Sequence, residues 1–589
     1  MHYCNSALED FCAIFSPCTF SSKRGRCVNV KERHAKGHQN ARGQIIGTGP
    51  YESDFTWESF AGEWARLLQT HLSDLQNKVQ TVMTVTLDNE LNAITDFHSH
   101  NVNRFFQRLG GASNFVSHST CFCCLRDLAE HPLPCGHILC SACIKHYGRQ
   151  HAKVAELFTI NSCPLHELDT KFPTPWEIQF KPPSAGVRIL SLDGGGIRGI
   201  VILEVLRAIE IELGKKIPIQ NFFDLIVGTS TGGLLALGLG IKDWSVDHII
   251  EIFPKLIDKA FTPKLSGLKF GRRKYRTRPL EEVLVEHFKD EPLFGGFHEA
   301  IARPSPRVAV TAATETGDQA VIFTNYNRAD ADQIGYRLIR PDDPKDELKI
   351  WEAARATSAA PTFFRPFVNP CTKEGFLDGA VFHNNPVRIA NYESKLIWPD
   401  VEDFHPDILL SVGTGHNGID TEGFINVAPL DRRRLHERKV LSKTKPVNEK
   451  QRPMPALRAF PEVHSWLNIL FKRVDNILDS EAIWRNFRKD IIGISSSHVA
   501  QRYIRINPRI RFQTPKMDEK SQVGKLQSDV RSRMQSQSMR EKVSVITARL
   551  VASSFYFEQS GPAKEYGDHY IVQGKSSFVA EIQSKERKY

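Results

Sequence analysis

Residues 222–233 read FFDLIVGTSTGG, a short apolar run that ends in a Gly-x-Ser-x-Gly sequence. A segment rich in leucine, alanine and glycine follows it. This order predicts a strand, a sharp turn that exposes Ser230, and a helix whose N-terminus lies behind the serine. The helix dipole would favour negative charge that develops there. On its own, the stretch is equally compatible with a tight turn that contains an incidental serine.

Upstream, residues 187–199 read VRILSLDGGGIRG and predict another strand, a glycine-rich turn and a helix that extends to Gly214. The backbone N–H groups of Gly194, Gly195 and Gly196 can approach a ligand oxygen, as in an oxyanion hole or a phosphate cradle. The stretch is neither Gly-x-Gly-x-x-Gly with a ribose-binding acid nor Gly-x-x-x-x-Gly-Lys-Ser/Thr. A dinucleotide or nucleoside triphosphate site is therefore the weaker alternative.

Downstream, residues 375–386 read GFLDGAVFHNNP, in which Asp378 ends a short apolar run and turn signals follow. Three motifs, DGGGIRG at 193–199, GTSTGG at 228–233 and DGA at 378–380, together with RATSAAP at 355–361, resemble the patatin-like phospholipases, close to the calcium-independent phospholipase A2 branch. The resemblance covers roughly residues 186–420 and implies an α/β fold, a three-layer sandwich with a mostly parallel central sheet. Alternating strand-like and helical runs between residues 187 and 412 predict the same layers from periodicity.

The resemblance also implies a serine–aspartate dyad. In it, Ser230 attacks an ester carbonyl as the nucleophile, Asp378 accepts its proton, and the three glycines hold the oxyanion. Arg198 would contact a headgroup phosphate or brace the glycine turn. A free aspartate, with a pKa of about 3.9, is a weak base at neutral pH. The dyad therefore requires a desolvated Asp378 whose pKa is raised.

A Ser–Asp–His triad is the alternative, because α/β-hydrolases use a histidine that follows the acid in the chain. His383, His405 and His416 follow Asp378, and His416 is the strongest candidate because it comes directly after a predicted strand. The upstream motif argues against the triad, since it begins with aspartate and not with the histidine of the His-Gly-Gly-Gly type.

A second strong pattern lies in residues 118–168. Its spacing, Cys-x2-Cys, Cys-x-His-x2-Cys-x2-Cys and Cys-x2-His, fits two tetrahedral zinc sites, with the first and third ligand pairs on one ion and the second and fourth pairs on the other. It resembles a RING-type cross-brace, in which two structural zinc ions would supply folding energy that so small a core lacks. The predicted ligands are Cys121, Cys124, Cys140 and Cys143 for one ion, and Cys135, His137, Cys163 and His166 for the other.

Two positions depart from the RINGs of ubiquitin ligases. Cys123 stands where those modules usually carry an aliphatic residue, and Glu167 stands where many carry a basic one. Both positions help such modules to engage a conjugating enzyme, so the module suits a scaffold for a protein partner better than a ligase. Cys123 is also a surplus thiol that could compete as a zinc ligand.

Composition indicates a globular chain, with 41% hydrophobic and 24% charged residues over a length of 589, enough for three or four domains. The net charge of +10 suits an anionic membrane surface as well as nucleic acid. Lipid chemistry makes the membrane the more economical partner, and no nucleic acid is expected. Residues 1–20 carry no Lys or Arg, and residues 225–241 are one of the two longest uncharged runs. We therefore expect neither a secretory signal nor a membrane span, and a cytoplasmic protein peripherally associated with membranes.

The predicted organisation has seven segments: a basic arm with cysteines and histidines (1–53), a helical region (54–115), the zinc module (118–168), a proline-rich linker (169–185), the hydrolase domain (186–420), a basic linker (421–458) and a C-terminal accessory region (459–589). In the arm, Cys18, Cys27, His34 and His38 could bind one zinc, although their spacing matches no standard finger. An insertion at 242–300, with a basic cluster at 272–278, could form a cap over the serine that touches lipid headgroups, but a solvated basic face is the commoner arrangement.

Together these patterns predict a serine lipid acyl hydrolase of the phospholipase or lysophospholipase type, with structural zinc in the N-terminal module and no cofactor for catalysis. The alternative is a zinc-dependent adaptor or RING ubiquitin ligase whose patatin-like domain only docks on membranes. The presence of Ser230, Asp378 and the glycine loop together favours the hydrolase, since a domain without activity has no need of all three.

Overall fold

A computed structural model describes most of the chain, except residues 1–5, 41–43, 82–86, 167–170, 265–273, 296–305, 330–334, 402–404, 418–478 and 579–589 and isolated positions elsewhere. The chain divides into two compact units, Met1–Leu109 and Gly110–Tyr589. The predicted basic linker 421–458, the start of the predicted accessory region (459–478) and Glu167 lie outside the described residues.

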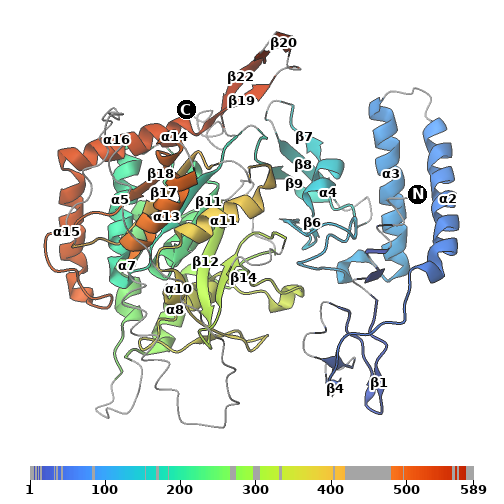
Figure 1. Ribbon diagram of the computed structural model, residues 1–589, viewed down its shortest axis with the longest axis horizontal. Coiled ribbons are helices and arrows are strands. Elements are labelled where there is room, and N and C mark those ends of the chain that lie inside the picture. Colours follow the sequence, from blue (N-terminus) through green and yellow to red (C-terminus); the bar gives the residue numbers. More distant parts are fainter. Residues whose placement is uncertain are drawn as a thin grey trace, which may run out of the picture. The chain divides into compact units, whose positions relative to one another are not determined.

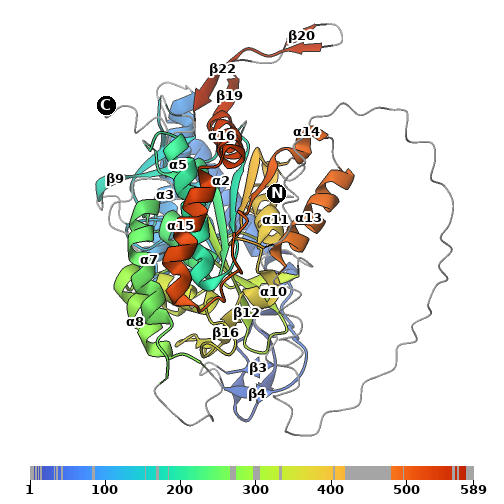
Figure 2. The ribbon, with the colours of Figure 1, turned by 90° about the vertical axis from the view of Figure 1, so that its left-hand side faces the viewer.

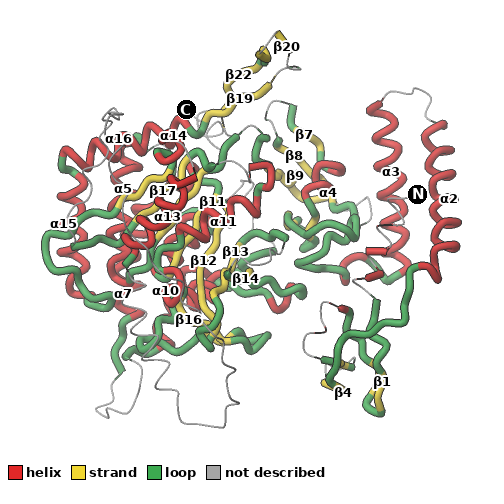
Figure 3. Tube along the Cα trace, in the orientation of Figure 1, coloured by secondary structure: helices red, strands yellow, loops and turns green. Residues whose placement is uncertain are grey.

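The N-terminal unit contains two short hairpins followed by two long helices (Figure 1). The predicted helical periodicity corresponds to two helices that pack on each other, although α2 buries no residue fully. Figure 3 shows how short the strands of this unit are beside its loops. The elements are β1 (Ser21–Ser22), β2 (Gly25–Arg26), β3 (His38–Gln39), β4 (Ile45–Gly47), α2 (Glu58–Gln80) and α3 (Leu87–Arg108).

The second unit is built on a nine-stranded sheet in the order β14-β13-β12-β11-β10-β17-β18, with β16 paired to β12 and β15 to β16. The strands around β10 run parallel, whereas β12 pairs antiparallel with β13 and β16. The strands are β10 (Arg188–Leu192), β11 (Leu225–Thr229), β12 (Arg307–Thr314), β13 (Ala320–Thr324), β14 (Tyr336–Leu338), β15 (Phe367–Val368), β16 (Gly375–Asp378), β17 (Ile408–Val412) and β18 (Tyr503–Ile506).

Helices cover both faces of this sheet, as Figure 2 shows edge-on. Alternate strand residues divide between two cores, with Leu190 and Ile226 in one and Ile189 and Leu225 in the other, because successive side chains point to opposite faces. The first core includes α5 (Gly199–Glu212), α6 (Thr231–Gly240), α7 (Val246–Ala260), α8 (Thr277–Phe288), α15 (Val523–Met534) and α16 (Gln537–Ala552), and the second includes α11 (Val387–Ile397) and α13 (Ser480–Ile494). The predicted three-layer sandwich is confirmed.

The C-terminal region contributes to this same sheet. Strand β18 pairs parallel to β17 along Leu409–Val412, although it lies outside the range 186–420 that we predicted for the hydrolase. Beyond it, β19 (Phe555–Gln559) pairs antiparallel with β22 (Gly574–Phe578), and the intervening β20 (Lys564–Tyr566) and β21 (His569–Ile571) form a hairpin.

Residues 118–179 form a small module of β5 (His131–Pro132), β6 (Ile138–Leu139), α4 (Ser141–Tyr147), β7 (Arg149–Gln150), β8 (Leu157–Ser162) and β9 (Lys171–Gln179). Strand β9 lies in the segment that we predicted as a linker, and it pairs with β8. The prolines at 173 and 175 suggested a linker, but β9 is an edge strand of its three-stranded sheet, where proline is tolerated.

This module packs on the hydrolase core through buried polar contacts. The Asn327 side-chain amide donates to the carbonyl oxygens of His118 (2.6 Å) and Ala129 (2.9 Å). The His118 ring contacts the Glu347 carboxylate at 3.1 Å, and both side chains are almost fully buried. Among the described residues, no helix is long and apolar enough to cross a bilayer.

Candidate active site

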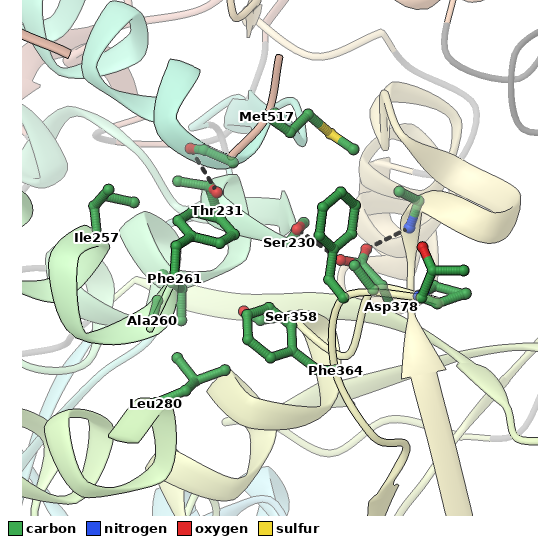
Figure 4. A pocket seen from close by; sticks show the side chains of 18 of the residues that line it. Ser230, Thr231, Ile257, Ala260, Phe261, Leu280, Ser358, Phe364, Asp378 and Met517 are labelled. Atoms are coloured by element: carbon green, nitrogen blue, oxygen red, sulfur yellow. Dashed lines mark hydrogen bonds between the residues drawn. The ribbon is translucent and has the colours of Figure 1, made fainter. Parts of the chain in front are cut away.

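Ser230 stands at the turn between β11 and α6 (Figure 4). Its φ of 52° lies in the left-handed region, an uncommon conformation for a residue with a side chain. Neighbouring glycines make the turn possible, because a Cβ at Gly232 would lie 2.4 Å from the Leu192 carbonyl oxygen. The Ser230 N–H donates to Thr357 Oγ1 at 2.9 Å, and Thr357 Oγ1 donates in turn to the Thr311 carbonyl. The serine is thus held in a strained turn by the surrounding fold.

Asp378, at the end of β16, is the partner of this serine. The Ser230 Oγ donates to Asp378 Oδ2 at 2.7 Å, and Asp378 Oδ1 accepts the Ala380 N–H at 2.8 Å. The carboxylate is 2% exposed. Burial raises its pKa to about 7, against the opposing effect of these two hydrogen bonds. Asp378 is therefore a much stronger base than a free aspartate and is largely ionised just above neutral pH.

The histidines of the alternative triad lie elsewhere. His405 Nδ1 contacts the Tyr503 hydroxyl at 2.8 Å, and the His416 backbone pairs with residues 508–510 beyond the end of β17. Burial lowers the pKa of His383 to about 4. Within the described part of the chain, none of the three lines the cavity beside Ser230, and the side chain that receives its hydroxyl hydrogen bond is Asp378.

In the glycine loop, one of the three backbone N–H groups is engaged within the fold. The Gly194 N–H, which we predicted to bind an oxyanion, donates to the Asn384 carbonyl at 2.9 Å and is therefore already used. Gly195 and Gly196 line the cavity directly. Gly196 has a φ of 59°, and a Cβ there would lie 2.2 Å from the Met517 carbonyl oxygen, so glycine is needed at this position.

Arg198 braces this loop. Its Nε donates to the Gly195 carbonyl at 3.4 Å, and it is not among the residues that line the cavity. Of the two roles that we considered, the contact fits the structural one.

Sequence reasoning missed a buried ion pair at the start of the loop. Arg505, on β18, donates through Nη2 to Asp193 Oδ2 at 2.7 Å and through Nη1 to Ser411 Oγ at 2.7 Å. Its Nε donates to Glu481 on α13 at 2.6 Å. A single arginine in the apolar strand sequence YIRI was the available signal, because a charge buried in a sheet requires a partner.

An apolar cavity opens beside the Ser230 hydroxyl (Figure 4). Part of its wall comes from the predicted insertion 242–300, whose helices α7 and α8 contribute to the lining. In the basic cluster, Arg272 and Arg273 lie outside the described residues, and Lys274 pairs with Asp518. The apolar lining residues include Leu234, Leu256, Ile257, Ala260, Phe261, Leu280, Phe363, Phe364 and Met517.

The module at 118–166 brings its eight predicted ligands into two groups, in the interleaved pairing that the sequence predicted. One group is Cys121, Cys124, Cys140 and Cys143, and the other is Cys135, His137, Cys163 and His166. Cys123 is buried but belongs to neither group.

The geometry of both groups fits zinc. Cys124 and Cys140 have sulfur atoms 3.8 Å apart, and His137 Nδ1 lies 3.4 Å from Cys135 Sγ and 3.6 Å from Cys163 Sγ. Ligand atoms around a tetrahedral zinc, with bonds of about 2.0–2.3 Å, are separated by about 3.3–3.8 Å. The His137 Nε2 lies 2.9 Å from the Ala112 carbonyl, the outer hydrogen bond that orients a metal-binding imidazole.

The fold and the site define an α/β protein with a serine–carboxylate pair at a strand–turn–helix elbow. Residues 190–391 match the family model described as patatin-like phospholipase, and the chain carries a patatin-like phospholipase domain.

Known relatives agree with this family. Phospholipase A I of Arabidopsis thaliana is 30% identical over 40% of this chain and 21% of its own length. Human calcium-independent phospholipase A2-gamma is 31% identical over 42% of this chain and 30% of its own length. The cGAMP-activated phospholipase of Escherichia coli (strain TW11681) is 32% identical over 39% of this chain and 62% of its own length. The chain therefore spans less than two thirds of each of these relatives.

Proposed function

We propose that this protein is a serine lipid acyl hydrolase that cleaves the acyl esters of phospholipids or lysophospholipids. The observation that carries the proposal is the 2.7 Å hydrogen bond from Ser230 Oγ to the buried Asp378 carboxylate, beside an apolar cavity that suits an acyl chain. The names of the relatives, all phospholipases, support the same reaction.

In the proposed mechanism, Asp378 removes the Ser230 proton as Oγ attacks the ester carbonyl. The N–H groups of Gly195 and Gly196 stabilise the negative charge on the carbonyl oxygen. Asp378 then returns the proton to the leaving alcohol, and water releases the acyl group from the serine by the reverse sequence. This route uses only groups of the chain, and zinc in the module would be structural.

The proposed substrate places the protein at a membrane surface. The net charge of +10 favours contact with anionic lipid headgroups, and the apolar cavity gives an acyl chain a place outside the bilayer. A cytoplasmic location with peripheral membrane attachment is part of this proposal, since most of the cysteines gather in groups that suit metal binding. The zinc module would supply a surface for a protein partner.

A fluorophosphonate probe tests the proposal without knowledge of the substrate. The wild-type protein should be labelled at Ser230, and it should release fatty acid from phospholipid vesicles. If the zinc-loaded protein resists the probe and cleaves no lipid ester, the hydrolase proposal fails and the adaptor alternative takes its place. Autoubiquitination with several conjugating enzymes would then test that alternative.

The rate of ester hydrolysis should rise as the pH rises through about 7, because the pKa of Asp378 is about 7 and only its ionised form accepts the serine proton. A solvent-exposed aspartate would place the same rise near a pH of about 4. The measurement is kcat/KM on a soluble ester as a function of pH, with circular dichroism as the control for folding. A rate independent of pH between about 5 and 8 would contradict the assigned base.

Removal of zinc should open the module but spare the hydrolase sheet. Structural zinc contributes on the order of 10 kcal/mol to the folding of such small modules. After treatment with EDTA, limited proteolysis should cut within residues 118–166 and leave β10 to β17 intact, and added zinc should restore protection. Protein purified under reducing conditions without any zinc in this module would refute the prediction.

A further inference from the structure

Four more metal-ligand side chains meet in the N-terminal unit, apart from the zinc module. Their donor atoms all lie within 4.8 Å of one another. Cys18 and Cys27 are 0% and 1% exposed, and His34 and His38 are 7% and 2% exposed. Four buried donors that converge on one point are the arrangement that binds a tetrahedral metal ion.

The separations between these donors are close to those around such an ion, although the pair of histidine nitrogens is somewhat shorter. His34 Nε2 lies 3.0 Å from His38 Nδ1, Cys18 Sγ lies 3.4 Å from His38 Nδ1, and Cys27 Sγ lies 3.8 Å from His34 Nε2. Around a tetrahedral zinc, donors bonded at about 2.0–2.3 Å are about 3.3–3.8 Å apart. The values in this cluster are similar to those of the two groups in the module.

The four donor side chains come from two local structures, a hairpin and a turn. Cys18 and Cys27 flank the β1–β2 hairpin, which is closed by a hydrogen bond from the Cys27 N–H to the Phe20 carbonyl. His34 and His38 flank a turn in which the Gly37 N–H donates to the His34 carbonyl. The spacing of these four residues matches no standard zinc finger, but a hairpin followed by a turn brings all four donors together.

The apolar core of this region is too small to fold it. Its buried members are Cys18, Cys27 and Ile46, with Phe20 and Tyr51 packed against them. The Phe20 ring stacks on the His38 ring at a centroid distance of 3.8 Å, and Tyr51 meets His34 edge-on. The rings of Phe20 and Tyr51 therefore pack against the two imidazoles. Two of the three buried core residues are cysteines, so the core contains little apolar surface beyond Ile46. Regions this small usually need a metal or disulfides for stability.

We propose that Cys18 Sγ, Cys27 Sγ, His34 Nε2 and His38 Nδ1 bind a third, structural zinc ion. Two thiolates and two imidazoles are the donor set that zinc prefers, whereas magnesium and calcium take oxygen ligands. All four positions are filled by the protein, so this ion has no open site for chemistry. Its role is to fold residues 16–53.

The test is the zinc content of the full-length protein, measured by mass spectrometry of the metal after dialysis under reducing conditions. Replacing Cys18 and Cys27 with serine should remove one zinc ion per chain. The matched control replaces Cys12 and Cys371, which belong to none of the three metal-ligand groups, and should remove none. Replacing Cys121 and Cys124 should remove an ion independently, so the two losses add in the combined variant.

A second pair of variants keeps the test valid if the Cys18/Cys27 variant does not fold. His34→Ala should lose the same zinc ion, whereas His34→Cys, which keeps a zinc ligand, should retain it. Protease cuts within residues 16–53 should appear only in the variants that lose zinc. Equal zinc content in the wild type and in the Cys18/Cys27 variant would overturn the proposal, because the four side chains would then be a metal-free hydrogen-bonded cluster. Iron or copper in place of the third zinc would overturn it too.

Discussion

Ser230→Ala should abolish ester hydrolysis and leave the fold unchanged. The substitution removes the attacking hydroxyl, and loss of the nucleophile from such a unit costs on the order of 10⁴-fold or more in rate. The backbone contacts of the turn remain, since the Ser230 N–H still donates to Thr357 Oγ1. The measurements are fatty acid release from vesicles and labelling by the fluorophosphonate probe, both of which should disappear.

Ser358 provides a matched control for this variant. It lines the same cavity, and its hydroxyl has no hydrogen-bond partner among the described residues. Ser358→Ala should therefore change the rate far less than Ser230→Ala. Similar losses in the two variants would mean that serine replacement disturbs the cavity itself, and retained activity in Ser230→Ala would exclude it as the nucleophile.

Asp378→Asn should reduce the rate nearly as much, because an amide cannot accept the serine proton. Asparagine has almost the same shape, and its carbonyl can still accept the Ala380 N–H. His416→Ala should have a far smaller effect, since His416 does not line the cavity. Equal collapse of activity in the Ser230, Asp378 and His416 variants would instead establish a Ser–Asp–His triad.

The Asp378→Asn variant should be more stable than the wild type at alkaline pH. The pKa of Asp378 is about 7 in the fold and about 3.9 in an unfolded chain, so the folded state binds its proton more tightly. That contribution to stability is complete below a pH of about 4 and is lost as the pH rises through about 7. At a pH of about 8, Asp378→Asn should raise the free energy of unfolding by on the order of 1–3 kcal/mol.

Urea denaturation at two pH values measures this difference. The gain in unfolding free energy should be large at a pH of about 8 and small at about 4. A stable, inactive Asp378→Asn protein separates a lost base from a damaged fold. If the variant is instead less stable at alkaline pH, the ionised carboxylate stabilises the site and the raised pKa of Asp378 is wrong.

The amino-acid sequence is enough to predict the class of fold and the residues around the active site. Those features depend on short local patterns: apolar runs that form strands, and glycines at turns where a side chain cannot fit, as at Gly232 and Gly196. The interleaved metal groups also followed from spacing, because each Cys-x2-Cys pair directs two donors to one point. Asp378 could be paired with Ser230 only through the family resemblance, since 148 residues separate them.

The folded arrangement is needed to see which backbone and side-chain groups are free to act in the active site and what surrounds them. The Gly194 N–H is consumed by the Asn384 carbonyl, and Asp193 is neutralised by Arg505 from a strand more than 300 residues away in sequence. No local pattern encodes such contacts, because they arise when distant segments are brought together by burial of their apolar faces. The raised pKa of Asp378 has the same origin. The packed sheet excludes the water that would favour the charged carboxylate, and the spacing of residues in the sequence does not reveal this burial.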